Sequence, residues 1–466
     1  MGIGSKAIGD YPVPLCMSEA PQQHREQPPG PSGVPVVHNT LQYADDPLSF
    51  ITEVAREYGP VAEYDIGGMS FYQLSDPELV EHVLVQENQR YIKGELFQDS
   101  LGTVLGDGLL TSEGEFWRQQ RHLMQPSFLP QMLERYSDVM VEYTERMLAS
   151  WEDGETRDIH EDMMSLTVEI AAKTLFDVDI RDEESAVGDA LETVMDYSST
   201  SLRRPVDVPQ WVPTPRNRRY KQALEDLTDV VGGIVEDHRA GELDPESNDI
   251  VSLLLTFRDD DGNPLPDEQI RDELVTILLA GHETTALALT YTLHLLGNNP
   301  EQADTLRDEL DSVLDGDSPS FTELDDMTYT EQVVTEGMRI YPPVWELVRE
   351  AAEPDTVGGY DIEPGQTVSA QQWVIHRDPR FYDDPLDFRP SRWTKEFKRD
   401  LPKFAYFPFG GGPRRCIGDR FALLEARLAL ATIAQSWTVD PTHELEFDPS
   451  ITLRPEGTVE MVVNRR

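Results

Sequence analysis

The segment Phe409-Gly410-Gly411-Gly412-Pro413-Arg414-Arg415-Cys416-Ile417-Gly418, near the C-terminus, says most about this chain. It places one cysteine in a glycine-rich loop after an aromatic residue and two arginines, and a helix-like run from Phe421 to Ala434 follows. Successive glycines let a backbone pass close to a flat, bulky group. Amides after the cysteine can donate to a sulfur anion, and an arginine can reach a negative charge. The segment predicts that Cys416 binds a planar, anionic group.

A thiolate ligand to haem iron needs these features: a fixed sulfur, hydrogen bonds that tune it, and positive charge for the propionates. A lone cysteine is more often a buried free thiol, but the spaced pattern Phe-x-x-Gly-x-Arg-x-Cys-x-Gly favours the haem site. This pattern resembles the haem-binding loop of the cytochrome P450 superfamily. The resemblance makes Cys416 the metal ligand and places Phe409, Arg414 and Gly418 against haem b.

A long apolar segment upstream predicts a central helix from Asp267 to Leu296, roughly 45 Å long at 1.5 Å per residue. Its middle reads Ala280-Gly281-His282-Glu283-Thr284-Thr285. Taken alone, a threonine pair is an ordinary polar helix face, but the whole string resembles the oxygen-activation motif of the P450 superfamily. That resemblance gives proton delivery to Glu283 and Thr284, and it favours a monooxygenase over relatives that use peroxide.

Two further resemblances occur in the order that the superfamily requires. Glu336 and Arg339 precede a Tyr-Pro-Pro sequence and, with Arg392, resemble a structural triad behind the haem. An arginine fork matches a carboxylate and stays charged when buried, so a stable network is plausible. The haem propionates would be bound by the remaining matching residues, Trp117, Arg121, Arg349 and Arg414.

Composition limits the function. The 466 residues carry a formal net charge of −48, from 87 acids against 32 arginines and 7 lysines. Such a chain repels itself in dilute buffer, so we expect a cytoplasmic protein from a salt-loving organism that does not bind nucleic acid. Two cysteines, Cys16 and Cys416, exclude a disulfide framework. We expect no membrane anchor, because no stretch of about 18 uncharged apolar residues occurs.

The organisation along the chain is mainly α with small β-sheets, as in the P450 fold, with haem between the long central helix and the cysteine loop. We expect a tail over residues 1–38 and one haem domain over 39–466. Alternating patterns predict strands at Val61–Ile66 and Phe71–Leu74 and a strand-rich region from Val357 to Val374. The proline-rich segment Arg203–Arg219 predicts a loop.

The resemblance implies O2, an apolar substrate and an external electron donor as partners. A lipid or isoprenoid is the default substrate, and the expected pocket residues are Phe97, Ala280, Gly281, Trp345 and Val348. Residues 389–420 carry nine basic and three acidic side chains. We expect this segment to form a docking patch for an acidic ferredoxin. The alternative is that it is only a run of solvated basic side chains. The patch residues are Lys395, Lys398, Lys403 and Arg415. A haem-thiolate binding or sensor protein without turnover is the alternative function, disfavoured by Glu283 and Thr284.

Overall fold

The computed structural model describes residues 27–180, 184–203, 211–241, 248–259 and 261–466. The expected tail over residues 1–38 falls partly on residues 1–26, which with Cys16 lie outside the described residues. The following segment contacts the first strand, because the Glu63 N–H donates to the Pro29 carbonyl at 3.0 Å and the Asn39 N–H donates to the Asp65 carbonyl at 3.0 Å.

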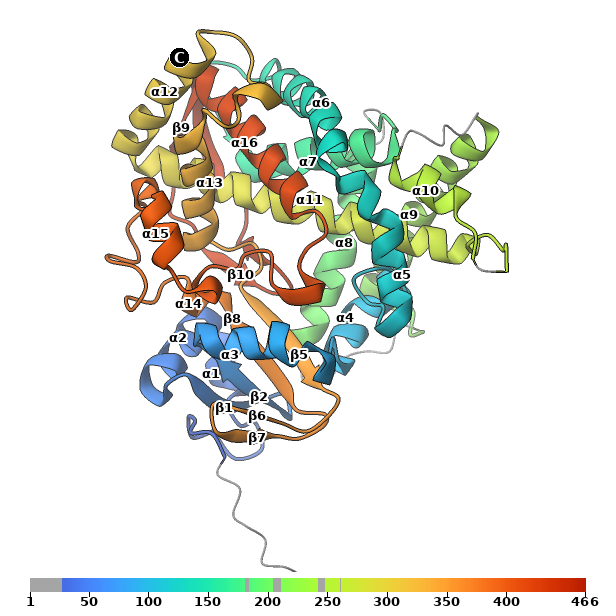
Figure 1. Cartoon of the computed structure of the whole chain (residues 1–466), viewed down its shortest axis with the longest axis vertical. Coiled ribbons are helices and arrows are strands. Elements are labelled where there is room, and N and C mark those ends of the chain that lie inside the picture. Colours follow the sequence, from blue (N-terminus) through green and yellow to red (C-terminus); the bar gives the residue numbers. More distant parts are fainter. Residues whose placement is uncertain (1–26, 181–183, 204–210, 242–247, 260) are drawn as a thin grey trace, which may run out of the picture.

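Helices make up most of the molecule; the five-stranded sheet lies at one end, and the sheet that contains β9 lies toward the opposite end (Figure 1). The helices are α1 Thr40–Asp45, α2 Pro47–Tyr58, α3 Pro77–Glu81, α4 Glu95–Leu105, α5 Gly114–Met124, α6 Pro130–Leu148, α7 Ile159–Phe176, α8 Glu184–Arg203, α9 Pro215–Ala240, α10 Ile250–Thr256, α11 Asp267–Asn298, α12 Pro300–Leu314, α13 Thr328–Ile340, α14 Gln372–Ile375, α15 Lys395–Asp400 and α16 Asp419–Ser436.

The strands form a five-stranded sheet in the order β1-β2-β8-β5-β3, a three-stranded sheet β4-β12-β9, and the hairpins β6–β7 and β10–β11. Their bounds are β1 Val61–Ile66, β2 Met69–Leu74, β3 Tyr91–Ile92, β4 Glu155–Asp158, β5 Glu346–Ala351, β6 Asp355–Val357, β7 Tyr360–Ile362, β8 Thr367–Gln371, β9 Trp437–Pro441, β10 Phe447–Pro449, β11 Leu453–Pro455 and β12 Glu460–Arg465. The predicted strand over residues 61–66 and the strand-rich region near 357–374 are confirmed.

The prediction of a loop over Arg203–Arg219 was wrong from Pro215 onward, and its residues 204–210 lie outside the described residues. Helix α9 begins at Pro215, and the Thr214 hydroxyl caps it by accepting a hydrogen bond from the Asn217 N–H at 3.1 Å. Proline is tolerated in the first turn of a helix, where its missing N–H is not needed, and threonine is a favoured cap. Both residues therefore start the helix here.

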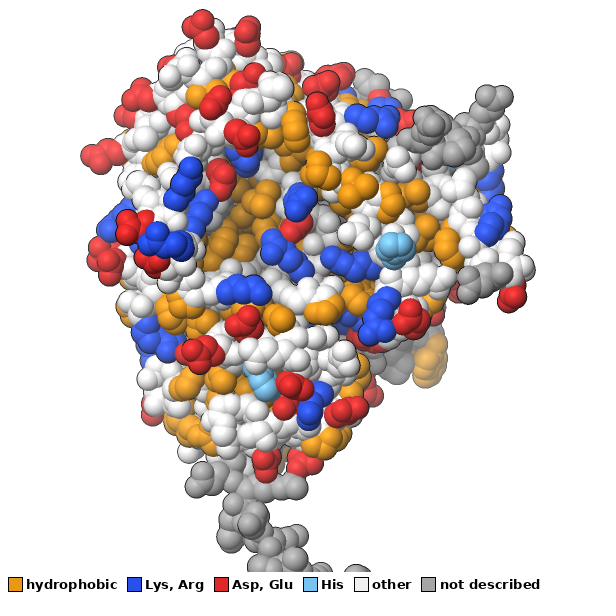
Figure 2. All heavy atoms as spheres, in the orientation of Figure 1, with side chains coloured by type: hydrophobic (Ala, Val, Ile, Leu, Met, Phe, Trp, Pro, Cys, Tyr) orange, Lys and Arg blue, Asp and Glu red, His pale blue; other side chains and the backbone are white. Residues whose placement is uncertain are grey.

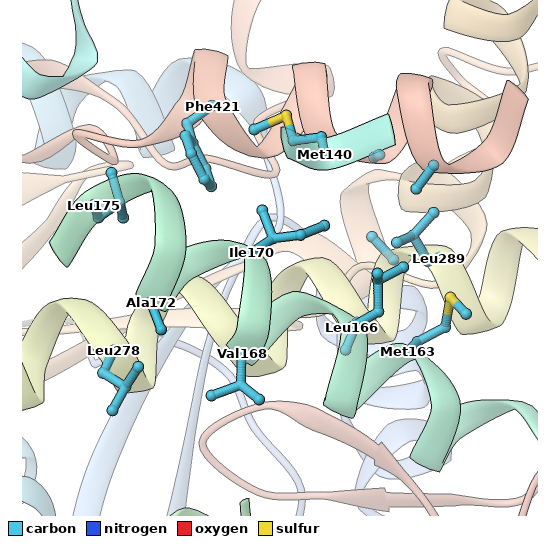
Figure 3. Packing of buried hydrophobic residues seen from close by; sticks show 14 of the residues in the cluster. Met140, Met163, Leu166, Val168, Ile170, Ala172, Leu175, Leu278, Leu289 and Phe421 are labelled. Atoms are coloured by element: carbon cyan, nitrogen blue, oxygen red, sulfur yellow. The ribbon is translucent and has the colours of Figure 1, made fainter. Parts of the chain in front are cut away.

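The core lies where α11 crosses the molecule between α7, α6 and α16. Side chains such as Ile170 of α7, Leu289 of α11 and Phe421 of α16 meet there (Figure 3). Within the described residues α11 is the one helix long and apolar enough to cross a membrane, and 83% of its apolar window is buried inside the protein. Its apolar composition is therefore explained by its place in the core.

Candidate haem-thiolate site

The sulfur of Cys416 is presented by a tight loop in front of α16. The Cys416 N–H donates to the Phe409 carbonyl at 3.0 Å, and the Gly418 N–H donates to the sulfur. Cys416 is exposed at the surface of the loop, but the surrounding protein keeps most solvent away from its thiol. This burial raises the pKa of the thiol despite the Gly418 amide and the nearby charges of Arg121 and Arg415. The loop thus supplies one fixed sulfur with a backbone donor, as a thiolate ligand requires.

The glycines of the loop are required by close approach to protein as well as by backbone conformation. Gly412 has φ 65°, and a Cβ there would lie 1.9 Å from the Leu84 carbonyl oxygen. A Cβ at Gly411 would lie 2.4 Å from the Phe404 ring. The sequence pattern suggested only an approach to a flat group, whereas these two glycines also let the loop pack against its protein neighbours.

Cationic side chains gather beside the loop. Burial and the charges of Arg349 and Arg414 lower the pKa of Lys93, and burial together with Arg414 lowers the pKa of Arg349 to about 10. Within the described chain Glu113 is the acid that opposes these three cations. Arg349 is buried and Lys93 and Arg414 are half-buried, so these three positive charges against one negative charge repel one another, and a group with two carboxylates would stabilise them. Haem b, with its two propionates, fits this cluster.

Helix α5 contributes the aromatic part of the same cluster. The guanidinium carbon of Arg414 lies 4.1 Å from the centre of the Trp117 ring, and that of Arg121 lies 5.9 Å from it. Trp117 is 8% exposed. The structure therefore brings together Trp117, Arg121, Arg349 and Arg414, which the sequence pattern placed up to some 300 residues apart.

Sequence reasoning missed Lys93. It follows β3, its backbone N–H donates to a Glu113 carboxylate oxygen at 2.8 Å, and its Nζ lies 4.7 Å above the Phe97 ring. The rarity of lysine was the available signal: Lys93 is one of only 7 lysines, and it sits between the apolar Ile92 and Gly94. A basic residue in an apolar setting within so acidic a chain indicates a specific partner.

The middle of α11 is open on one side. Ala280 is exposed and Gly281 and Thr284 are partly exposed, although the neighbouring Leu278 is buried. A Cβ added at Gly281 would meet nothing closer than the Ala171 Cβ at 3.9 Å. The Thr284 hydroxyl donates to the Ala280 carbonyl at 3.0 Å. This face of the core helix therefore borders space that a bulky ligand can fill.

Glu283 is buried, with 2% of its surface exposed. Its carboxylate accepts hydrogen bonds from the Thr452 hydroxyl at 2.7 Å and from Arg454 Nε at 2.5 Å. Burial opposes ionisation, but Arg454 and Thr452 outweigh it and lower the pKa of Glu283. The carboxylate next to Thr284 is therefore ionised at neutral pH.

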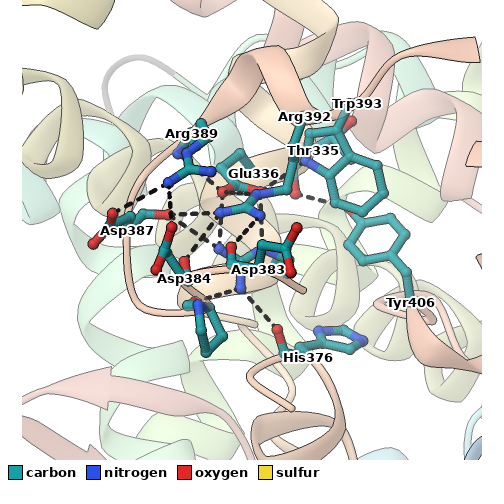
Figure 4. Close-up of polar contacts among 12 residues, drawn as sticks. Thr335, Glu336, His376, Asp383, Asp384, Asp387, Arg389, Arg392, Trp393 and Tyr406 are labelled. Carbon is teal, nitrogen blue, oxygen red and sulfur yellow. Dashed lines mark hydrogen bonds and ion pairs between the residues drawn. The ribbon is translucent and has the colours of Figure 1, made fainter. Parts of the chain in front are cut away.

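Glu336 and Arg392 lie together (Figure 4), and Arg339 pairs with the same Glu336 carboxylate. Arg339 donates to both carboxylate oxygens of Glu336 at 2.8 Å, Arg392 Nε donates at 2.9 Å, and Trp393 Nε1 donates at 2.8 Å. Arg339 Nη1 also donates to the His376 carbonyl at 2.8 Å. The network ties α13 to the loop that leads to α15.

The expected pocket residues divide into two groups. Ala280 and Gly281 border the open side of α11, and Phe97 and Val348 are partly exposed. Trp345 is 2% exposed in a separate core with Phe50 and Ile51, and its Nε1 donates to the Ser450 carbonyl at 2.7 Å. This placement does not support the prediction that Trp345 lines a substrate pocket, because both its ring and its N–H are already satisfied by the protein.

The face that carries α5 and α16 is hollowed. Figure 2 shows hydrophobic atoms in the hollow and Lys and Arg side chains around it. Three of the expected patch residues have acidic neighbours: Lys398 pairs with Glu331 at 2.6 Å, Lys403 with Glu81 at 3.7 Å and Arg415 with Asp419 at 2.7 Å. The local positive charge is therefore smaller than the sequence count suggested.

Comparisons with known proteins all indicate one protein family. Residues 28–460 match the family Cytochrome P450. The chain is 33% identical to cyclooctatin synthase of Streptomyces melanosporofaciens, over 92% of this chain and 93% of that protein. It is 34% identical to cyclooctat-9-en-7-ol 5-monooxygenase of that organism (92% and 93% covered) and to pentalenene oxygenase of Streptomyces avermitilis (89% and 92%).

A solved structure supports the fold. The crystal structure of the cytochrome P450DA heme domain superposes with a TM-score of 0.84 and 28% identity, covering 95% of this chain and 98% of that one. The Cys416 loop, the cation cluster and the open side of α11 all fit haem b. The chain therefore belongs to the cytochrome P450 family: it is a haem b monooxygenase that uses O2 and an external electron donor.

Proposed function

We propose that this monooxygenase inserts one oxygen atom of O2 into an apolar, isoprenoid-type substrate. The open face of α11 at Ala280, Gly281 and Thr284 carries the proposal, because it offers an apolar surface next to the proposed proton-delivery group. Relatives named for pentalenene and for cyclooctat-9-en-7-ol support the substrate class. Substrate binding is tested by screening isoprenoids for a shift in iron spin state, and fatty acids serve as the comparison set.

In this proposal, haem b held by Cys416 supplies the redox-active iron that activates O2. The reaction consumes O2, two electrons and two protons, and it releases water with the oxidised product. Thr284 orients the proton-bearing side of the site through its hydroxyl, which can leave the Ala280 carbonyl to bond a ligand. The Glu283 carboxylate accepts protons from the protein side and passes them on.

Substituting Thr284 by alanine tests this assignment. Electron consumption should continue while product per electron falls several-fold, by analogy with the loss of one positioned proton donor. The reduced carbon monoxide complex should keep its strongly red-shifted absorption, because the Cys416 ligand is untouched. Unchanged product per electron in Thr284→Ala would contradict the proposed roles of Thr284 and Glu283.

The electron donor is proposed to be an acidic ferredoxin that docks on the hollowed face. Lys395 is exposed and has no ion pair with a residue that the structure describes, so it is the basic group best able to meet an acidic partner. Lys398, Lys403 and Arg415 would exchange their acidic neighbours for the partner. Charge reversal at Lys395 and Lys398 should slow reduction, and reversal at Lys221 of α9 is the matched control. An equal reduction rate in all variants would contradict this docking site.

The negative charge of −48 supports a salt-rich cytoplasm as the place where the protein works. At about 1 M salt the screening length is only about 3 Å, so a donor would be held by contacts rather than by long-range attraction. The docking test is therefore made at several potassium chloride concentrations.

A further inference from the structure

A buried polar network surrounds Glu283 and extends to the protein surface. Arg454 Nε donates to the buried Glu283 carboxylate at 2.5 Å, and Arg454 Nη1 donates to Asp196 of α8 at 2.7 Å. The Arg454 side chain is 12% exposed, whereas that of Asp196 is 64% exposed. One guanidinium therefore bridges a carboxylate in the core and a carboxylate at the surface.

The hairpin that carries Arg454 is fixed against α11. Leu453 lies between Thr452 and Arg454, its N–H donates to the Pro343 carbonyl at 2.8 Å, and its carbonyl accepts a hydrogen bond from the Tyr291 hydroxyl of α11. Leu453 is fully buried. Thr452 and Arg454 therefore keep a constant position relative to Glu283, two turns before Tyr291 on the same helix.

Two imidazole nitrogens lie in the same network without a partner among the described residues. They are His282 Nε2 of α11 and His160 Nδ1 of α7, and both are buried. Burial lowers the pKa of His282 to about 4 and also lowers the pKa of His160, so both rings are neutral at neutral pH. Both interact electrostatically with Glu283 and Arg454. An unpaired buried nitrogen in polar surroundings is a place for an ordered water, which can pass a proton.

We propose that Arg454 is a positioning residue for Glu283: it fixes the carboxylate beside Thr284 and connects it through Asp196 to the surface of α8. The neutral side chains of His282 and His160 border the route by which protons reach Glu283 from the surface of α8. The inference rests on the proton-delivery role proposed above for Glu283.

The charges around Glu283 make this arrangement testable. Arg454 favours the ionised carboxylate, whereas burial favours the protonated one, and Asp196 draws part of the Arg454 charge away. Removing Arg454 should therefore raise the pKa of Glu283, and removing the Asp196 charge should lower it. The titratable and charged groups that face this network are Asp158 at the end of β4, His160 of α7, Glu192 and Asp196 of α8, His282 and Tyr291 of α11, and Arg454 of β11.

The experiment compares Arg454→Gln and Asp196→Asn in the haem-loaded enzyme. The first readout is the apparent pKa of the acidic limb in the pH profile of product per electron. The second is the infrared carbonyl stretch of protonated Glu283, identified by its loss in Glu283→Gln. Arg239→Gln is the matched control, because it breaks an exposed ion pair with Asp267 at the start of α11.

Arg454→Gln should move both titrations to higher pH by about 1–3 units, the usual effect of losing an opposite charge in contact with a carboxylate. Asp196→Asn should move them to lower pH by less than about one unit, because its charge is screened. Arg239→Gln should move neither, and Arg454→Lys should restore most of the wild-type value. Shifts in the same direction, or no shift, for Arg454→Gln and Asp196→Asn would overturn the proposal.

The experiment distinguishes a failure of the proton-delivery role of Glu283 from a failure of the positioning role of Arg454. If Glu283→Gln leaves product per electron and its pH profile unchanged, the proton-delivery role of Glu283 fails. If Glu283→Gln abolishes the acidic limb but Arg454→Gln only lowers the unfolding temperature, Arg454 is merely structural and the further inference fails alone. Should Arg454→Gln not fold, the surface variant Asp196→Asn still decides, since the absence of a downward shift contradicts the proposal.

Discussion

Replacing Glu336 by glutamine should destabilise the protein more than any single change at its surface. The Glu336 carboxylate is fully buried, and Arg339 is fully buried with it. Arg392 is 6% exposed and bonds the same carboxylate at 2.9 Å. Glutamine keeps the shape of the side chain but removes the charge, so two guanidiniums would face a neutral group in the interior.

The cost follows from that geometry. Removing one partner of a buried ion pair costs about 3–5 kcal/mol, because the remaining charge is left uncompensated. The carbonyls that accept from Arg339, among them His376 at 2.8 Å and Pro385 at 2.6 Å, will still hold its guanidinium and limit the loss. We therefore expect about 3 kcal/mol, a large fraction of the 5–15 kcal/mol typical of a folded protein.

The assay is urea unfolding of the haem-loaded protein at constant high salt, followed by both haem absorption and circular dichroism. Glu396→Gln is the control, since Glu396 is 81% exposed and pairs only loosely with Arg399 at 3.8 Å. That variant should unfold at the wild-type midpoint. A loss of less than about 1 kcal/mol in Glu336→Gln would refute the view that this carboxylate compensates two buried cations.

Three further outcomes are expected. Lys93→Met or Arg349→Met should weaken haem retention by about tenfold or more, because each variant removes a charge-assisted contact of about 1.5–3 kcal/mol. Retention is measured by the transfer of haem to apomyoglobin. Retention equal to that of the wild type would contradict the propionate site. Lowering the potassium chloride concentration from about 1 M to about 0.1 M lengthens the screening length from about 3 Å to about 10 Å and should lower the unfolding temperature. An unchanged unfolding temperature would contradict the expected repulsion among the acidic side chains. Burial raises the pKa of Glu273 from 4.5 to about 8, so stability should fall as pH rises through that window, and Glu273→Gln should flatten the fall.

The sequence alone predicted the chemistry of the Cys416 loop and the identity of the central helix. Cys416 and its glycines lie within ten residues, so their spacing is a local property that a pattern can carry. The predicted helix over Asp267–Leu296 differs from the observed Asp267–Asn298 only at its end, where Gly297 and Asn298 continue the last turn. Local start signals and apolar periodicity are sufficient for such an element.

Only the tertiary structure decided which distant side chains meet. Lys93 joins Arg349 and Arg414 across more than 250 residues of chain, and Arg454 reaches Glu283 across 171 residues. The same Glu-x-x-Arg spacing occurs many times in this chain, and its burial at Glu336 depends on Arg392 arriving from another loop. Charge pairing and burial are properties of the packed state, because the energy of a charge depends on the solvent and partners that folding leaves around it.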